Sequence, residues 1–174
     1  HYVFAYSRGA DTTATFTLED LGLRNAAYVY DYVAGIGGVY HPGDVLSHHV
    51  GNRAGYYIVV PVGLSGIALL GDSGHFVSLS KKRIAQLTDD GKVNVEVTFA
   101  AGETSRTLFG YSLHKPRASA RTGRVSRMVY DPSTGLFSVH VMAGTDNKTS
   151  LTIWAPADER RRPPVPSPRD SVER

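Results

Sequence analysis

A serine between glycines, in the segment Gly71-Asp72-Ser73-Gly74, is the first candidate for chemistry in this sequence. His48 and His49 precede it and could act as the base. A nucleophilic serine needs a base within hydrogen-bond reach and a pocket for the oxyanion, and the sequence demonstrates neither. A β-turn explains all four residues, since Gly, Asp and Ser are typical of turns. We therefore expect no hydrolysis through Ser73.

Histidines and paired aspartates raise the question of a metal site. Adjacent residues of a strand point to opposite faces, so His48 and His49 cannot reach one ion unless the strand bulges there. The Asp89-Asp90 turn offers oxygen ligands for calcium, but no spaced ligand loop surrounds it. We expect no metal and no cofactor. The histidines considered are His41, His48, His49 and His75.

Glycoside hydrolysis normally needs two carboxylates that face each other across a cleft. The candidate aspartates all lie beside Gly or Pro or at the ends of expected strands, where Asp commonly supports turns. No two of them stand out as a pair, and we expect no catalytic residue in this chain. These aspartates are Asp31, Asp44, Asp72 and Asp131.

Three tyrosines, Tyr28, Tyr30 and Tyr32, are the candidate ligand-binding residues. They occur at spacing two in an expected strand and so lie on one face of it. Exposed aromatic rings in such a row would form a platform on which sugars stack. Packing in the core explains the same spacing, and both readings remain open at this point.

The composition favours a folded, all-β protein. Of the 174 residues 41% are hydrophobic and 20% are charged, which is enough apolar surface for a core. The 18 Gly and 10 Tyr, with many Val and Thr between closely spaced turns, favour strands over helices. The absence of cysteine excludes a disulfide framework and a thiolate metal site.

The distribution of charged and apolar residues indicates whether the chain binds nucleic acid or a membrane. The formal net charge is +3, and much of the positive charge lies in the last fifteen residues among acidic side chains. No basic stripe with interleaved aromatics occurs, so we expect no nucleic-acid partner. No apolar run is long enough to span a membrane, so we expect no membrane partner. Because the chain opens on a strand-like segment without Met, we expect a fragment or processed product.

The turn spacing of about ten residues is typical of a sandwich. We expect an antiparallel β-sandwich of Greek-key type over residues 1–79, opened by a hairpin of residues 2–7 and 12–18. A second small, Ig-like β unit follows over 80–155. Its clearest strand alternates apolar and polar residues from Val93 to Phe99, and residues 104–111 should pair with it. A disordered tail rich in Pro and Arg completes the chain over 156–174.

Residues 2–79 resemble the C-terminal β-sandwich of alpha-galactosidase-like (melibiase clan) glycoside hydrolases. The resemblance lies in three motifs and their order: Phe4-Ala5-Tyr6-Ser7-Arg8-Gly9, Asp20-Leu21-Gly22-Leu23 and Tyr28-Val29-Tyr30-Asp31-Tyr32-Val33-Ala34-Gly35. It implies a domain that packs on an upstream catalytic barrel, which carries the catalytic carboxylates. No catalytic residue transfers to this chain.

These observations predict a non-catalytic accessory β region of a larger glycoside hydrolase, which stabilises or shapes an upstream catalytic domain of the same polypeptide. The alternative is a carbohydrate-binding module. We expect an extracellular or periplasmic location.

The first prediction concerns catalysis by the chain alone. We expect no hydrolysis of aryl glycosides, peptides or esters above a buffer control, because each reaction needs a converging set of residues that the sequence lacks. Ser73→Ala and Asp31→Asn should affect stability at most. Turnover that survives stringent purification and disappears in either variant would refute this assignment.

Overall fold

The computed structural model describes residues 1–7, 9, 11–51, 54–72 and 83–156. Within these ranges the fold is all-β, as the composition predicted, with fourteen strands, one short 3-10 helix and no α-helix. No helix within these ranges is long enough and apolar enough to cross a membrane. Ser73, His75 and the expected tail from residue 157 onward lie outside the described residues.

The N-terminal part contains two antiparallel sheets. One has four strands in the order β1-β6-β3-β4, and the other pairs β2 with β5. Between β2 and β3, the 3-10 helix η1 ends at Gly22, which has a left-handed φ of 73°. The elements are β1 (Tyr2–Ala5), β2 (Thr12–Phe16), η1 (Glu19–Leu21), β3 (Ala27–Asp31), β4 (Ile36–Tyr40), β5 (Leu46–Val50) and β6 (Gly55–Pro61).

The C-terminal part is a sandwich of two four-stranded antiparallel sheets. Their strand orders are β12-β13-β10-β7 and β11-β14-β9-β8. The strands are β7 (Ile67–Gly71), β8 (Ile84–Asp89), β9 (Val93–Thr98), β10 (Ser105–Ser112), β11 (Arg117–Ala120), β12 (Arg124–Tyr130), β13 (Leu136–Met142) and β14 (Lys148–Trp154).

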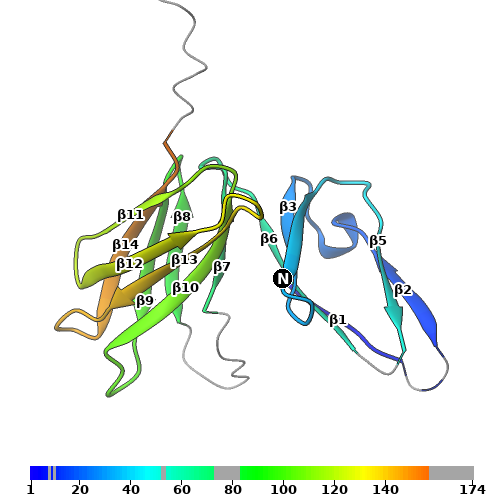
Figure 1. The fold of residues 1–174 in the computed structure, drawn as a ribbon, viewed down its shortest axis with the longest axis horizontal. Helices are drawn as coiled ribbons and strands as arrows, with labels where there is room; N and C mark the ends of the chain where they lie inside the picture. The colour runs from blue at the N-terminus through cyan, green and yellow to red at the C-terminus, as the bar shows by residue number, and fades with distance from the viewer. Residues whose placement is uncertain (8, 10, 52–53, 73–82, 157–174) are drawn as a thin grey trace, which may run out of the picture.

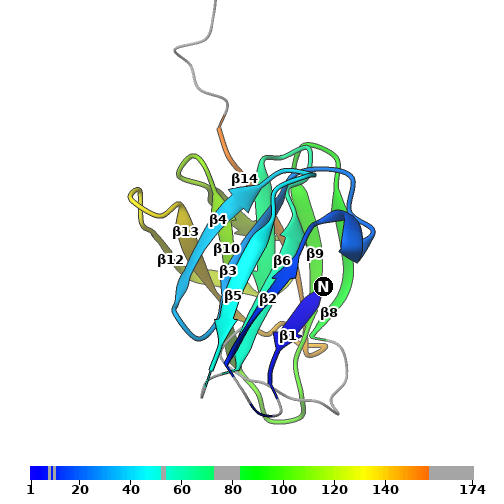
Figure 2. The ribbon, with the colours of Figure 1, turned by 90° about the vertical axis from the view of Figure 1, so that its right-hand side faces the viewer.

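The four sheets follow one another as layers, seen edge-on in Figure 1. Viewed from the side of β2 and β5, these two strands lie in front of the four-stranded sheet of β1, β6, β3 and β4 (Figure 2). A separate apolar cluster fills each interface between successive layers. The largest contains Val93, Val95, Val97, Leu108, Val139, Leu151 and Ile153, all almost fully buried.

Strand β7 belongs to the C-terminal sandwich, although it falls within residues 1–79 of the expected first unit. It pairs with β10, from Ile67 opposite Ser112 to Gly71 opposite Phe109. All five of its residues are buried. Ile67 and Leu69 join the cluster of the sandwich, whereas Ala68 and Leu70 join the cluster shared with the N-terminal sheet. A continuous apolar strand needs cover on both faces, which only an inner layer supplies.

Two expected strand pairings are wrong. Residues 2–7 and 12–18 do not form a hairpin: β1 pairs with β6, and β2 pairs with β5. Likewise β10 does not pair with β9. It pairs with β13 and β7, while β9 pairs with β14 and β8. In both places the connection leads from one sheet to another. Such crossings bury the apolar faces of two sheets against each other, which a simple hairpin would not do.

Tyr28 joins the two parts of the chain. It is fully buried, and its ring stacks on Tyr111 of β10 with centroids 4.2 Å apart and an interplanar angle of 13°. Glycines make room for both rings: a Cβ at Gly37 would lie 2.6 Å from the Tyr28 ring, and one at Gly135 would lie 2.6 Å from Tyr111. The contact therefore needs glycine at both positions.

Burial raises the pKa of Tyr28 to about 12, with smaller contributions from Tyr111 and Tyr30. The Tyr28 hydroxyl is buried and has no hydrogen-bond partner in the described part of the chain. An uncompensated buried hydroxyl is destabilising, so the contribution of Tyr28 to stability comes from its ring.

We predict that Tyr28→Ala lowers the free energy of unfolding by about 3–5 kcal/mol, as expected for removal of a buried aromatic ring. Tyr28→Phe should be at least as stable as the natural protein, and the exposed Tyr32→Ala should cost about 1 kcal/mol or less. Urea unfolding measures all three. Equal losses for Tyr28→Ala and Tyr32→Ala would contradict the burial account.

Candidate functional site

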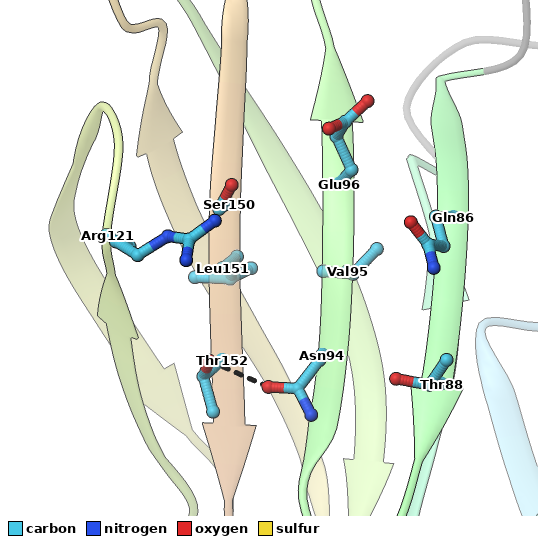
Figure 3. A pocket seen from close by; sticks show the side chains of 9 residues that line it. All are labelled: Gln86, Thr88, Asn94, Val95, Glu96, Arg121, Ser150, Leu151 and Thr152. Atoms are coloured by element: carbon cyan, nitrogen blue, oxygen red, sulfur yellow. Dashed lines mark hydrogen bonds between the residues drawn. The ribbon is translucent and has the colours of Figure 1, made fainter.

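A shallow groove of about 350 Å³ lies on the outer face of the β11-β14-β9-β8 sheet (Figure 3). This face points away from the sandwich core, because the alternate residues of β9 and β14 are buried in the cluster beneath it. The groove is lined by Gln86, Thr88, Asn94, Val95, Glu96, Arg121, Ser150, Leu151 and Thr152.

Strand register arranges the polar side chains of the groove in two rows across the sheet. In one row Glu96 stands opposite Gln86 on β8 and opposite Ser150 on β14. In the other row Asn94 stands opposite Thr88 and Thr152. Neighbouring strands lie about 4.8 Å apart, so each row presents a polar group at every strand spacing.

Hydrogen bonds hold several of these groups in place. Thr152 Oγ1 donates to Asn94 Oδ1 at 2.9 Å, which turns the amide nitrogen of Asn94 away from β14 (Figure 3). Lys148 Nζ donates to Glu96 Oε1 at 2.8 Å. This hydrogen bond, together with the charge of Glu96, raises the pKa of the Lys148 ammonium. The groove thus has fixed amide, hydroxyl and carboxylate groups on a rigid sheet.

The chemistry of the groove is that of binding. Amides and hydroxyls both donate and accept hydrogen bonds, which suits a ligand rich in hydroxyl groups. Glu96 supplies the one carboxylate among the lining residues, whereas glycoside hydrolysis by acid and base or nucleophile requires two. The groove therefore has the groups to recognise a polar ligand but not this pair.

A smaller cavity of about 290 Å³ lies between the four-stranded N-terminal sheet and β5, with Asp31 and Tyr57 in its lining. Tyr57 Oη lies 2.6 Å from His48 Nδ1. Burial, followed by the charge of Asp31 and the proximity of Tyr40, raises the pKa of Tyr57. Asp31 Oδ1 accepts hydrogen bonds from the backbone N–H groups of the next turn. Both polar groups thus already have partners within the protein.

Two of the three candidate tyrosines lie on β3, and Tyr32 follows the end of this strand. Tyr28 is fully buried against Tyr111, so its ring is closed to any ligand. Tyr30 packs at the margin of the same apolar cluster. Tyr32 is 38% exposed and its ring centroid lies 5.2 Å from that of Tyr56. Tyr28 and Tyr30 pack in the same cluster, whereas Tyr32 follows the end of β3 and is the one of the three with substantial exposure.

Three of the four candidate aspartates support turns. Asp31 accepts bonds from the N–H groups of Val33 and Ala34 at 2.9 Å, and Asp44 accepts one from His41 N at 2.7 Å. Asp131 accepts bonds from Ser133 and Thr134, with Ser133 making the larger contribution to its lowered pKa.

The fourth aspartate, Asp72, belongs to an ion-pair network at one end of the sandwich. Its carboxylate lies 3.5 Å from Arg83 Nε and 3.9 Å from Arg106 Nε. Both arginines also pair with Glu103, and Arg83 Nη2 donates to Glu103 Oε1 at 3.0 Å. The four side chains lie at the end of β7, just before β8 and at the start of β10. The network therefore connects the two sheets of the C-terminal sandwich.

The candidate histidines within the described ranges do not converge on one site. His48 contacts Tyr57, while the exposed His49 lies 3.9 Å from Asp11 on the other face of β5. Within the described ranges no group of three His, Asp or Glu side chains is placed to hold a metal ion.

The sequence alone did not indicate the groove as a binding site, although it did indicate which residues of β9 face water. Asn94 and Glu96 alternate with buried valines and so were expected to face water. Their neighbours Thr152 and Arg121 lie more than twenty residues away in the sequence. Only the pairing of β9 with β14, and of β14 with β11, brings these residues together.

We predict that Glu103→Gln lowers the free energy of unfolding by about 1.5–3 kcal/mol, because two partly buried guanidinium groups lose a charged partner. The control is Lys148→Met, which removes the more exposed pair with Glu96 and should cost less than about 1 kcal/mol. Urea unfolding at low and high salt measures both. A larger loss for Lys148→Met would contradict a structural role for the network.

No protein-family model matches this sequence, and a search of curated proteins finds no significant match. The relation to alpha-galactosidase-like enzymes accordingly stays a prediction from the short motifs of residues 2–79.

Proposed function

We propose that this chain is a non-catalytic accessory β region of a glycoside hydrolase, and that it binds carbohydrate in the groove on the β11-β14-β9-β8 sheet. The observation that carries the proposal is the pair of polar rows across this sheet, from Gln86 and Thr88 to Ser150 and Thr152. The glycosidase context rests on the motif resemblance in residues 2–79.

Several features of the groove support a saccharide as the ligand. Its side chains offer hydrogen-bond donors and acceptors at regular strand spacing, and a sugar chain offers hydroxyl groups along its length. Its floor is a packed sheet, so the groups are held in place before the ligand arrives, which lowers the entropic cost of binding.

The exposed apolar side chains of the N-terminal sheet favour a second role, packing against a catalytic domain. Both edge strands of this sheet present such residues: Tyr2 is 66% exposed on β1, and Ile36 is 65% exposed on β4. Sheet edges and exposed apolar patches are commonly covered by a partner surface. Hydroxyl-radical footprinting tests this role. Tyr2 and Ile36 should be protected in the natural polypeptide relative to the chain alone, and equal labelling would argue against it.

We predict that the double variant Asn94→Ala/Thr152→Ala weakens binding of the chain to polysaccharide at least about tenfold, since it removes two central hydrogen-bonding groups. Affinity electrophoresis in gels containing a panel of polysaccharides measures the effect. Thr13→Ala, an exposed threonine on β2, is the matched control and should change nothing.

The thermal midpoints of both variants should stay close to that of the natural protein. A natural chain that is retarded by no polysaccharide, or a double variant that binds as well as the natural chain, would refute carbohydrate binding in the groove.

A further inference from the structure

Arg121 is the cation among the residues that line the groove, and no acidic side chain pairs with it among the described residues. Its backbone N–H donates to Ser150 O at 2.8 Å, which holds its main chain beside β14. Its side chain extends from the edge of the sheet toward Ser150, over the groove (Figure 3). It is exposed and forms no ion pair with any residue in the described part of the chain. Within the described residues, its guanidinium therefore has no charged partner.

The acid of the same groove is already neutralised. Glu96 is bound by Lys148 at 2.8 Å. Its negative charge therefore does little to offset Arg121 or to repel an anion. The outer face of the sheet carries two further cations: Arg117 is exposed four residues before Arg121, and Lys92 lies 6.0 Å from the centroid of the Trp154 ring. Asp90 Oδ1 lies 3.4 Å from Asn94 Nδ2 at the other side of the groove, so the cations are concentrated on the side of β11 and β14.

A guanidinium in this setting favours an oxyanion that presents two oxygen atoms, such as a carboxylate or a sulfate ester. Its fork of N–H groups matches a carboxylate with two parallel hydrogen bonds, a geometry that lysine does not offer. Ser150 and Glu96 continue the same row across the sheet, where a sugar bearing the anion would meet the next polar groups. The guanidinium of Arg121 beside a row of hydroxyl and amide groups fits a saccharide that carries an anionic group.

We propose that the groove binds an acidic polysaccharide, with an anionic group of one sugar unit held by Arg121. This inference rests on the proposed carbohydrate binding and specifies the class of ligand. The shared chemistry is an anion on a sugar, which a uronic acid supplies as a carboxylate and a sulfated sugar supplies as a sulfate ester.

The test compares three polymers with the full chain: polygalacturonate, dextran sulfate and neutral dextran. At low salt the natural chain should bind at least one acidic polymer about tenfold or more tighter than dextran, and the difference should shrink at high salt. Stronger binding of polygalacturonate supports a carboxylate ligand, and stronger binding of dextran sulfate supports a sulfate ligand.

Variants of Arg121 separate its role from general charge. Arg121→Gln should abolish the preference for the acidic polymer, and Arg121→Lys should keep only part of it, because the charge remains but the fork is lost. Arg24→Gln removes an exposed arginine outside the groove and should leave the preference unchanged.

The outcomes distinguish this inference from the proposal on which it depends. A preference that persists in Arg121→Gln, or equal binding of acidic and neutral polymers that is lost in Asn94→Ala/Thr152→Ala, overturns the acidic ligand but leaves the groove as a carbohydrate site. Acidic-polymer binding that Arg24→Gln weakens as much as Arg121→Gln also overturns it. Absence of binding to every polymer overturns both.

Discussion

The contact between Tyr28 and Tyr111 determines how the two parts of this chain fit together. The rings stack face to face at 4.2 Å, and a side chain at Gly37 or Gly135 would occupy the space that they need. Around them Ile58 and Ala68 complete an apolar cluster drawn from both parts. Because dense packing tolerates little change of volume, this interface holds the N-terminal sheet and the sandwich in one arrangement.

In that arrangement the β12-β13-β10-β7 sheet is an inner layer, with another sheet packed on each of its faces. One face of β7 packs on the N-terminal sheet and the other packs into the sandwich. Among the described residues, the β11-β14-β9-β8 sheet is then the outermost layer on its side and packs against another sheet on one face. Its inner face is a continuous row of valines and isoleucines, so its outer face is free to display polar groups without loss of core.

The division of the molecule into two surfaces follows from the same layers. The polar outer sheet has amides, hydroxyls and an arginine that forms no ion pair within the described residues, which suits recognition of a hydrophilic polymer. The N-terminal sheet instead exposes aromatic and aliphatic side chains at its edge strands, such as Tyr2 and Ile36, which suits contact with another protein surface. An accessory region that connects a polysaccharide to an enzyme needs one surface of each kind.

By itself the sequence determined the all-β class, most of the strands and the roles of several turns. These depend on local patterns: the alternation from Val93 to Phe99 requires one buried face, and Asp31 and Asp131 bond to the backbone of their own turns. It also indicated the strand that contains Tyr28 and Tyr30, which pack in one cluster. It did not foresee β4 or β11, since Gly37 and Gly38 read as a turn and the short segment of β11 has little apolar signal.

Only the tertiary structure decided which strands pair and which surfaces remain open. The pairing of β1 with β6 and of β7 with β10 joins segments more than thirty residues apart, and nothing in the local pattern of either segment specifies its partner. The same holds for the groove. Asn94, Arg121 and Thr152 line one groove only because β9, β14 and β11 lie side by side, and burial of the opposite faces of these strands in one core fixes that order.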